Sequence, residues 1–420
     1  MLKKIVIGLD GATFDLLNPW IEDGELPNIK KLIAGGTSAV MVSCLPPVTC
    51  PNWKCYSTGK GPGKLGIFWW EKVDVNNRTI ESVRYADHVK SKEIWDLMNN
   101  RGYRTAVINM PTTYPPKEIE GCMIAGGPDC PNKNFTYPEE LEGELKDKFG
   151  YKIRPKGIAK LRSKNTRAVS EVLQQIQRLF AVTRYLMGQN SYNFIHLTIF
   201  CISVVQHFLW DDEIVKEIWS SIDREIGNLL LEVPEGCGVI IMSDHGMREV
   251  SKEFYINKWL EEKGYLVLKE GTDRLLSKRT SYKKGLVLVE VLKKIRLKDI
   301  FKKILPFKRY LLSPNVFVGG IREEKARRID WDKSRVIASG QGPLYLIGSK
   351  DGSDYEDLRN EVIASLRELK DPETEKPVVE KIYRQEEVYP LVLTDNAPDK
   401  VLESENSYTI NGELGDTPVF

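Results

Sequence analysis

The hydrophobic residues of this 420-residue chain form short continuous runs in some places and one-sided helical patterns in others. Continuous β-branched and aliphatic runs are typical of strands buried on both faces of a parallel sheet. Such runs predict strands at 4–8, 105–110, 194–199 and 238–241. Apolar residues at helical spacing predict helices over 164–188 and 213–231. This alternation of strands and helices predicts an α/β fold with a central, mostly parallel sheet flanked by helices.

The alternation of strands and helices stops at about residue 252 and resumes after Trp331. Strands at 335–338 and 344–347 and a helix over 354–369 are predicted to return the chain to the sheet. We therefore expect a catalytic core made of residues 1–251 and 331–420, interrupted by an inserted helical, basic cap at 252–330.

The predicted cap carries a local excess of positive charge. Between Lys269 and Arg309 there are fourteen Lys and Arg residues against four Asp and Glu. Residues 292–312 mix apolar and basic side chains at helical spacing, which fits a weak contact with an anionic membrane or an electrostatic guide for anionic substrates. A solvated cap face is the simpler interpretation, because Pro306 limits the length of any single helix.

The overall composition favours a soluble, cytoplasmic protein. Lys and Arg (61) balance Asp and Glu (59), so the chain offers no electrostatic argument for a nucleic-acid partner. Seven cysteines without a CxxC pair are typical of reduced, intracellular proteins. The first strand begins within four residues of the N-terminus, which leaves no room for a signal peptide. No apolar run approaches the roughly 20 residues that span a bilayer.

Acidic residues follow two of the predicted strands directly. Asp10 comes after the first strand, and Asp244 and His245 come after the strand at 238–241. Ligands of open α/β sheets bind at the carboxyl ends of the strands, so these three residues indicate a metal site. The alternative is that Asp10 caps a turn and that Asp244 and His245 belong to a polar loop.

Thr49 lies just before a predicted helix that begins near Pro51. The free backbone N–H groups and the dipole of a helix N-terminus favour an anion such as a phosphate. The alternative is that Thr49 only caps the helix, as many threonines do. The Gly- and Lys-rich stretch at 57–66 lacks the spacing of a nucleotide-binding P-loop and is weak evidence for one.

Five segments in the right order resemble the type I phosphodiesterase/nucleotide pyrophosphatase family of the alkaline phosphatase superfamily. They are Asp10 after the first strand and the segments 46–53 (PPVTCPNW), 58–68 (TGKGPGKLGIF), 205–210 (VQHFLW) and 243–247 (SDHGM). The resemblance covers most of the chain. It implies an alkaline-phosphatase-like fold and a two-metal site around a threonine nucleophile.

The resemblance assigns the first half of this site to residues that are all present. Thr49 matches the nucleophile, and Asp10, Asp244 and His245 match the ligands of the metal that touches its hydroxyl. Asn52 matches a residue whose amide holds a phosphate oxygen, together with the backbone N–H that follows Thr49. The alternative for Asn52 is a residue of the first helical turn that makes only local hydrogen bonds.

The second half of the site departs from the family pattern. His207 matches a ligand of the second metal, but Ser203 stands where the family has an aspartate, and a serine hydroxyl is a poor zinc ligand. Asp211 and Asp212 lie nearby without a family precedent. The chain contains four histidines and none beyond His245, so the closing histidine of the family is absent. We therefore expect a shortened copy of the family or the front part of a split gene.

These features imply a hydrolase of phosphodiester or nucleotide pyrophosphate bonds in small phosphorylated substrates, with a phosphothreonine intermediate. The implied cofactor is a divalent metal, zinc or alternatively manganese, as one or two ions. Loss of the second metal would leave the departing oxygen unassisted and would weaken or abolish activity. A non-catalytic relative that binds a phosphorylated ligand or partner is the main alternative. A sulfatase or phosphomutase is a third, although the motifs of those branches are missing.

Overall fold

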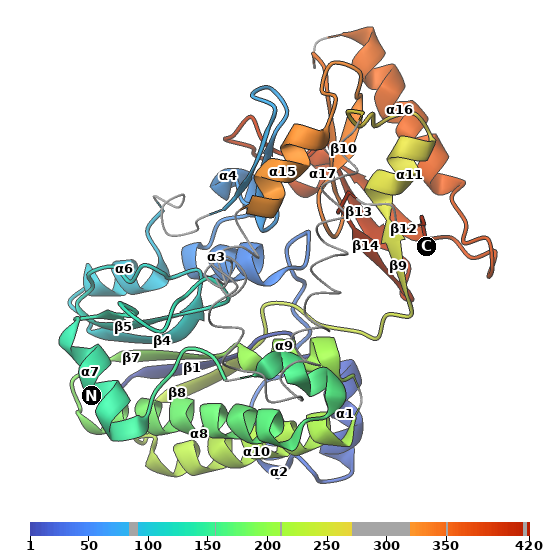
Figure 1. The fold of residues 1–420 in the computed structure, drawn as a ribbon. Coiled ribbons are helices and arrows are strands. Elements are labelled where there is room, and N and C mark those ends of the chain that lie inside the picture. The colour runs from blue at the N-terminus through green and yellow to red at the C-terminus, as the bar shows by residue number, and fades with distance from the viewer. Residues whose placement is uncertain (84–90, 156, 211, 271–319, 350–351, 415–417) are drawn as a thin grey trace, which may run out of the picture. The chain divides into compact units, whose positions relative to one another are not determined.

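A computed structural model describes residues 1–83, 91–155, 157–210, 212–270, 320–349, 352–414 and 418–420. These residues form two compact units (Figure 1). Unit 1 contains residues Met1–Ile67 and Arg84–Glu249, and unit 2 contains Phe68–Val83 and Val250–Phe420. Each unit is described by itself below.

Unit 1 is built on a six-stranded sheet with the order β6-β5-β4-β7-β1-β8. All neighbouring strands are parallel except β5 and β6. The strands are β1 (Lys4–Leu9), β4 (Thr105–Pro111), β5 (Gly121–Gly126), β6 (Thr136–Tyr137), β7 (Phe194–Ile199) and β8 (Gly238–Met242). The predicted strands and the predicted central, mostly parallel sheet flanked by helices are confirmed.

Helices cover both faces of this sheet (Figure 1). The helices of unit 1 are α1 (Phe14–Glu22), α2 (Pro27–Gly35), α3 (Thr49–Thr58), α4 (Pro62–Leu65), α6 (Ile94–Asn99), α7 (Glu140–Phe149), the 3-10 helix η1 (Ile158–Ser163), α8 (Thr166–Gly188), α9 (Cys201–Phe208) and α10 (Glu213–Glu232), and all of them except α4 lie along this sheet. Helices α8 and α10 confirm the two long helices predicted from apolar spacing. Strands β7 and β8 lie on either side of β1. The chain crosses from β7 to β8 through α10, so this connection places both strands next to β1.

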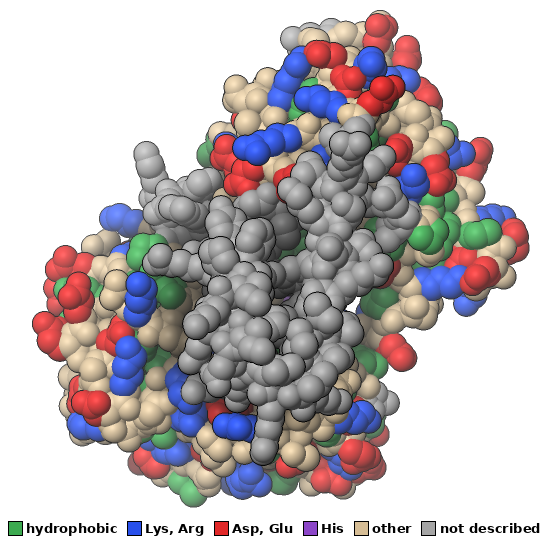
Figure 2. Space-filling model, viewed as in Figure 1, with side chains coloured by type: hydrophobic (Ala, Val, Ile, Leu, Met, Phe, Trp, Pro, Cys, Tyr) green, Lys and Arg blue, Asp and Glu red, His purple; other side chains and the backbone are tan. Residues whose placement is uncertain are grey.

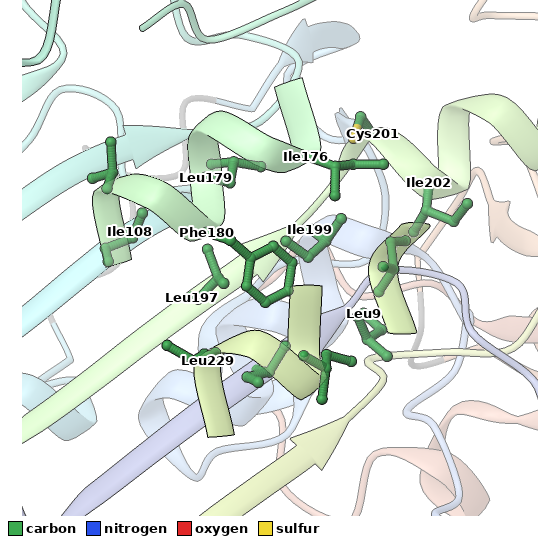
Figure 3. Close-up of a cluster of buried hydrophobic side chains, with 14 of the residues drawn as sticks. Leu9, Ile108, Ile176, Leu179, Phe180, Leu197, Ile199, Cys201, Ile202 and Leu229 are labelled. Atoms are coloured by element: carbon green, nitrogen blue, oxygen red, sulfur yellow. The ribbon is translucent and has the colours of Figure 1, made fainter. Parts of the chain in front are cut away.

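Alternate residues of the strands face two different cores. Figure 3 shows Phe180 and its neighbours on α8 pointing towards Leu9, Leu197 and Ile199 of the strands. The intervening positions of the strands face α3 and α6, where Trp53, Trp95 and residues of β4 and β5 form a smaller cluster. Side chains of a strand alternate between the two faces of the sheet. The pattern of buried residues along a strand therefore determines towards which face the side chain that follows the strand points.

Unit 2 contains a separate four-stranded antiparallel sheet with the order β10-β11-β13-β12. Its elements are β2 (Glu71–Asp74), β3 (Thr79–Ser82), β9 (Lys252–Tyr255), α11 (Ile256–Glu262), α15 (Gly320–Arg328), β10 (Val336–Ala338), β11 (Pro343–Leu346), α16 (Ser353–Arg367), β12 (Val379–Arg384), α17 (Gln385–Val388), β13 (Lys400–Ser404) and β14 (Tyr408–Asn411). Strands β9 and β14 form a parallel pair, and β2 and β3 form a hairpin.

The prediction that the chain returns to the central sheet after Trp331 is wrong. Strands form close to the predicted positions, but β11 pairs with β10 and β13 and not with any strand of unit 1. These strands have their own hydrophobic core, in which Phe254, Trp259 and Val336 are buried. Hydrophobic runs predict that a strand is buried but do not specify its partner, because pairing depends on residues far away in the sequence.

The predicted cap lies mostly outside the described residues. The structure does not describe residues 271–319, which include the basic segment 292–312 and its predicted membrane contact. The boundaries of the cap at 252–330, and of the core at 1–251 and 331–420, therefore stay predictions.

The described surface carries mixed charges. On the face drawn in Figure 2, basic and acidic side chains are interspersed over both units, as the nearly equal numbers of basic and acidic residues suggest. None of the helices in the described ranges combines the length and the apolar character needed to cross a bilayer.

A buried carboxylate fastens the strand pair of unit 2. Asp371 is fully buried, and its Oδ2 accepts hydrogen bonds from Lys252 Nζ at 2.8 Å and from Tyr408 Oη at 2.6 Å. Its Oδ1 accepts from the Glu373 N–H at 2.8 Å. The hydrogen bond from Lys252, followed by that from Tyr408, lowers the pKa of Asp371. Because Lys252 begins β9 and Tyr408 begins β14, this carboxylate joins both strands.

Replacing Asp371 with asparagine is expected to lower the Tm by several degrees at neutral pH. The folded-state pKa of Asp371 lies below the unfolded value of about 3.9, so its contribution is present above that pH and is lost as the pH falls through the lowered folded pKa. The difference in Tm between wild type and Asp371→Asn should therefore shrink below about pH 4. Thermal unfolding across this pH range measures it.

The matched control is Asp332→Asn, which removes a carboxylate that pairs with Arg78 at 2.7 Å but is 75% exposed. Exposed ion pairs contribute little to stability, so this variant should stay close to wild type. An equal loss of Tm in both variants would contradict the role given to Asp371.

Candidate metal centre

Two adjacent strands of unit 1 bring three metal-binding side chains together. In the register of β1 and β8, Gly8 pairs with Met242, and Asp10 and Asp244 each follow two residues later. The ligand atoms of Asp10, Asp244 and His245 all lie within 4.8 Å of one another. This is the one group of three or more such residues found in the part of the chain that the structure describes. The three residues predicted from the strand ends are therefore neighbours in space.

One atom of each of these side chains is fastened to the protein. Trp53 Nε1–H donates to Asp10 Oδ2 at 2.7 Å. The Gly11 N–H donates to Asp244 Oδ1 at 3.3 Å. His245 Nδ1 lies 2.8 Å from the Gly246 carbonyl oxygen, which can only accept, so the proton of the neutral ring belongs on Nδ1.

The remaining atoms face one another. His245 Nε2 lies 3.9 Å from Asp10 Oδ1 and 3.4 Å from Asp244 Oδ2. Asp244 Oδ2 is buried and has no hydrogen-bond partner among the described residues. Two carboxylate oxygens and an imidazole nitrogen form a donor set that suits zinc or manganese, so these residues fit a divalent cation.

Burial makes this arrangement electrostatically costly without a cation. Asp10 is fully buried and Asp244 is 3% exposed. Burial raises the pKa of Asp10, against smaller opposing contributions from His245, Trp53, Ser203 and Thr49. The pKa of Asp244 is raised well above its ordinary value by burial and then by the negative charge of Asp10. A bound cation would oppose both effects on the pKa values, because it favours the charged form of each carboxyl group.

Gly11 allows the chain to turn beneath this group. Its φ is +71°, and a side chain there would lie 2.7 Å from Met247 Sδ and 3.3 Å from Ser203 Cβ. The Gln206 side chain supports the same turn by donating to the Gly11 carbonyl at 3.0 Å. The backbone that presents Asp10 is therefore specific for glycine at the next position.

Thr49 lies at the open side of the three residues. It is the first residue of α3 and is 7% exposed. Its Oγ1 lies 3.1 Å from His245 Nε2 and 3.4 Å from Asp10 Oδ1. Thr49 is not the N-cap residue of α3, because that position is occupied by Val48. The structure thus brings Thr49 to the two residues that the resemblance assigns to the same metal.

Asn52 makes only local hydrogen bonds. Its Nδ2 donates to the carbonyls of Val48 at 2.9 Å and Pro46 at 3.3 Å, and its Oδ1 accepts from the Cys44 N–H at 2.9 Å. Both amide hydrogens are used, so Asn52 would have to break one of these bonds to hold a phosphate oxygen. Its role towards a substrate stays a prediction, and its observed role is to fasten the loop before Thr49.

Two residues of the predicted second half-site, Ser203 and His207, lie near this group, since a Ser203 hydrogen bond lowers the pKa of Asp10 and the charges of His245 and Asp10 act on His207. Ser203 Oγ donates to the Phe200 carbonyl at 3.0 Å within α9. The His207 side chain is exposed, and its pKa is lowered by desolvation and by the nearby charge of His245. Asp212 caps α10 by accepting from the Ile214 N–H at 2.9 Å, and Asp211 lies outside the described residues. The metal-binding role of His207 therefore stays a prediction.

Sequence reasoning gave no role to Trp53, although it lies within the segment that resembles the family. Trp53 follows Thr49 by four residues, so both lie on the same face of α3 one turn apart. This spacing is the sequence signal that would have indicated a tryptophan near the site. The hydrogen bond to Asp10 depends on how α3 packs on the sheet, which the sequence does not specify.

The family model described as Type I phosphodiesterase / nucleotide pyrophosphatase matches residues 4–419. The chain belongs to this family. The predicted membership in a branch of the alkaline phosphatase superfamily is confirmed. No curated protein matches the chain in a sequence search.

Solved structures share the fold at low sequence identity. Phosphonoacetate hydrolase from Sinorhizobium meliloti 1021, in complex with phosphonoacetate, has a TM-score of 0.57 at 16% identity and covers 98% of this chain and 83% of its own. Its complex with phosphonoformate has a TM-score of 0.56 at the same identity and coverage. Human ectonucleotide pyrophosphatase / phosphodiesterase 5 reaches 0.49 at 13% identity over 97% of this chain and 80% of its own. The phosphonoacetate hydrolase structures support the alkaline-phosphatase-like fold.

Replacing Asp244 with asparagine is expected to separate stability from metal binding. The amide oxygen can still accept from the Gly11 N–H, while the second buried negative charge is removed. The metal-free variant should therefore unfold at the same temperature as wild type or at a higher one. Its affinity for zinc and manganese should fall by more than about 100-fold, beyond the loss typical of a residue that only supports a ligand. Thermal unfolding and calorimetric metal titration measure both quantities.

The control for loss of charge alone is Asp147→Asn, an exposed acid on α7. This variant should keep the metal affinity of wild type. Unchanged affinity in Asp244→Asn would show that Asp244 is not a metal ligand.

Proposed function

We propose that this chain is a metal-dependent hydrolase of phosphodiester or nucleotide pyrophosphate bonds that uses Thr49 as its nucleophile. The observation that carries the proposal is the position of Thr49 Oγ1, which lies 3.1 Å from His245 Nε2 and 3.4 Å from Asp10 Oδ1 at the start of α3. A metal held by Asp10, Asp244 and His245 would be within reach of this hydroxyl. Membership in a phosphodiesterase family supports the same reaction class.

The metal would lower the pKa of the Thr49 hydroxyl and draw negative charge from the phosphoryl group. Thr49 Oγ1, its proton lost to solvent, then attacks phosphorus, the bond from phosphorus to the leaving oxygen breaks, and the phosphoryl group is transferred to the threonine together with its remaining ester substituent. Water attacks the same phosphorus, the bond to Thr49 Oγ1 breaks, and a phosphomonoester is released while the hydroxyl is restored. The N-terminus of α3 favours the negative charge that develops beside Thr49.

Substrates with good leaving groups fit this site best. Ser203 replaces a carboxylate that would hold a second metal, so the leaving oxygen is stabilised less than in a two-metal site. An activated leaving group such as nitrophenolate needs little stabilisation, whereas an alkoxide needs several kcal/mol, which corresponds to many powers of ten in rate. We therefore propose a small phosphorylated substrate, zinc or manganese as the cofactor, and one ion as the working number.

Ser203 also favours a second candidate function. Its hydroxyl donates to the Phe200 carbonyl at 3.0 Å, and a neutral hydroxyl is a poorer zinc ligand than a carboxylate. A chain in which the second half-site is degraded could bind a phosphorylated ligand or partner in the same pocket without turnover. The two candidates differ in whether covalent chemistry occurs at Thr49.

Hydrolysis of bis(4-nitrophenyl) phosphate in the presence of zinc or manganese tests the proposal. We expect Thr49→Ala to lower the rate by at least about 1,000-fold, because the nucleophile is lost, and Thr49→Ser to retain measurable activity. The matched control is Thr58→Ala on the same helix, where Oγ1 donates to the Lys54 carbonyl at 2.6 Å and accepts from the Lys60 N–H at 3.3 Å. This control should keep the wild-type rate.

The outcome that contradicts an enzymatic function is a wild-type rate equal to that of Thr49→Ala with metal bound. In that case, metal-dependent binding of AMP by the wild-type chain would support the non-catalytic candidate. Mass spectrometry of the acid-quenched reaction adds an independent check, since a 4-nitrophenyl phosphoryl group on the peptide that contains Thr49 is expected only from the covalent route.

A further inference from the structure

We propose that Trp53 is a positioning residue of the metal centre, whose indole N–H holds one oxygen of Asp10 and so turns the other towards the metal. The inference rests on the proposed metal site and adds a residue that the family resemblance does not assign. It also gives a reason for the glycine at position 8, which leaves the space that the indole occupies.

The hydrogen bond from Trp53 to Asp10 is short and shielded from solvent. The distance from Nε1 to Oδ2 is 2.7 Å, and both side chains are fully buried. A hydrogen bond to an ionised acceptor is roughly twice as strong as one between neutral groups, and burial excludes competing water. Because the indole has one N–H and no acceptor, it can bind the carboxylate only through this contact.

Gly8 makes this contact possible. It lies two residues before Asp10 on β1, on the face covered by α3. A Cβ at this position would lie 2.5 Å from Trp53 Cη2 and 3.2 Å from Cζ3, so any side chain would displace the ring. The edge of the indole ring at Cη2 thus lies against the backbone of β1, the strand that Asp10 follows.

Two aromatic neighbours fix the plane of the indole. The ring of His196 lies 6.0 Å from that of Trp53 at 87°, and the ring of Tyr56 lies 5.8 Å away at 85°. Edge-to-face contacts of this kind are favourable and orient the rings. Burial lowers the pKa of His196 to about 3, so this neighbour is uncharged at neutral pH and does not attract the Asp10 carboxylate.

The consequence for Asp10 is a fixed rotation of its carboxylate. The terminal torsion of an aspartate is broad and roughly two-fold, so an unrestrained group would sample many orientations. With Oδ2 held by Trp53, Oδ1 faces His245 Nε2 at 3.9 Å and Thr49 Oγ1 at 3.4 Å. Asp10 is thereby oriented to bind a cation through Oδ1. Because the carboxylate is already ordered in the metal-free protein, less conformational entropy is lost when the metal binds.

The test compares Trp53→Phe with Trp95→Phe. Both tryptophans are fully buried and belong to the same hydrophobic cluster. The indole nitrogen of Trp95 has no hydrogen-bond partner among the described residues, so its replacement removes a similar ring without removing a contact to a ligand. Calorimetric titration of each metal-free protein with Zn²⁺ and with Mn²⁺ gives the affinities, and thermal unfolding of the metal-free proteins gives their stabilities.

We expect Trp53→Phe to weaken metal binding by about 10- to 100-fold, the usual effect of losing a residue that orients a ligand. Trp95→Phe should stay within about twofold of wild type, although both variants lose stability from the smaller ring. A purely structural role of Trp53 would lower the Tm without this difference in affinity.

Gly8→Ala perturbs the same contact from the other side. It should weaken metal binding in the wild-type background by displacing the indole, and should have less effect in the Trp53→Phe background, where the atom that meets the new methyl group is absent. Additive effects of the two substitutions would overturn the link between Gly8 and Trp53.

The results separate this inference from the proposed function. A wild-type chain that binds metal, with Trp53→Phe as tight as Trp95→Phe, would overturn only the positioning role. A wild-type chain that binds neither Zn²⁺ nor Mn²⁺ would overturn both the metal centre and this inference.

Discussion

The buried pair of carboxylates, Asp10 and Asp244, is the constraint on which the site depends. Two negative charges without solvent repel each other, and burial raises the pKa of both groups. A folded protein retains such a pair only where other groups compensate for it. One atom of each side chain is hydrogen-bonded to the protein: Asp10 Oδ2 to Trp53, Asp244 Oδ1 to the Gly11 N–H, and His245 Nδ1 to the Gly246 carbonyl. The second oxygen of each carboxylate and His245 Nε2 are the atoms that we propose bind a cation. The arrangement stores an electrostatic cost that metal binding would relieve.

The parallel sheet provides the precision that this pair requires. Strands β7, β1 and β8 are neighbours in register, so their carboxyl ends present side chains at one edge. Helix α3 then brings Thr49 to the same edge and places Trp53 one turn further on, against the glycine of β1. One helix therefore carries both the proposed nucleophile and the residue that orients its metal ligand. Because strands and helices are more rigid than loops, the distances between these groups are maintained without a bound ligand.

The two halves of the ancestral site differ in what the chain retains. The half around Thr49 has every side chain that the family resemblance assigns to the first metal. In the other half, Ser203 stands where the family pattern has an aspartate, and its Oγ donates to the Phe200 carbonyl at 3.0 Å. In a complete site the first metal activates the nucleophile and the second stabilises the leaving group. We propose that this difference between the halves favours substrates whose leaving groups need little stabilisation.

The sequence alone determined four of the six strands of the unit 1 sheet (β1, β4, β7 and β8), the two long helices of this unit, the family, and the fact that Asp10, Asp244 and His245 follow strand ends. These features are local, because the periodicity of apolar residues and the position of a residue after a strand depend only on residues close together in the sequence. Only the tertiary structure decided that β10 and β11 join a separate sheet, that the amide of Asn52 is used by its own loop, and that Trp53 reaches Asp10. Strand pairing and the orientation of a carboxylate depend on contacts between residues far apart in the chain, and a pattern along the sequence does not encode which distant side chain will fill a given space.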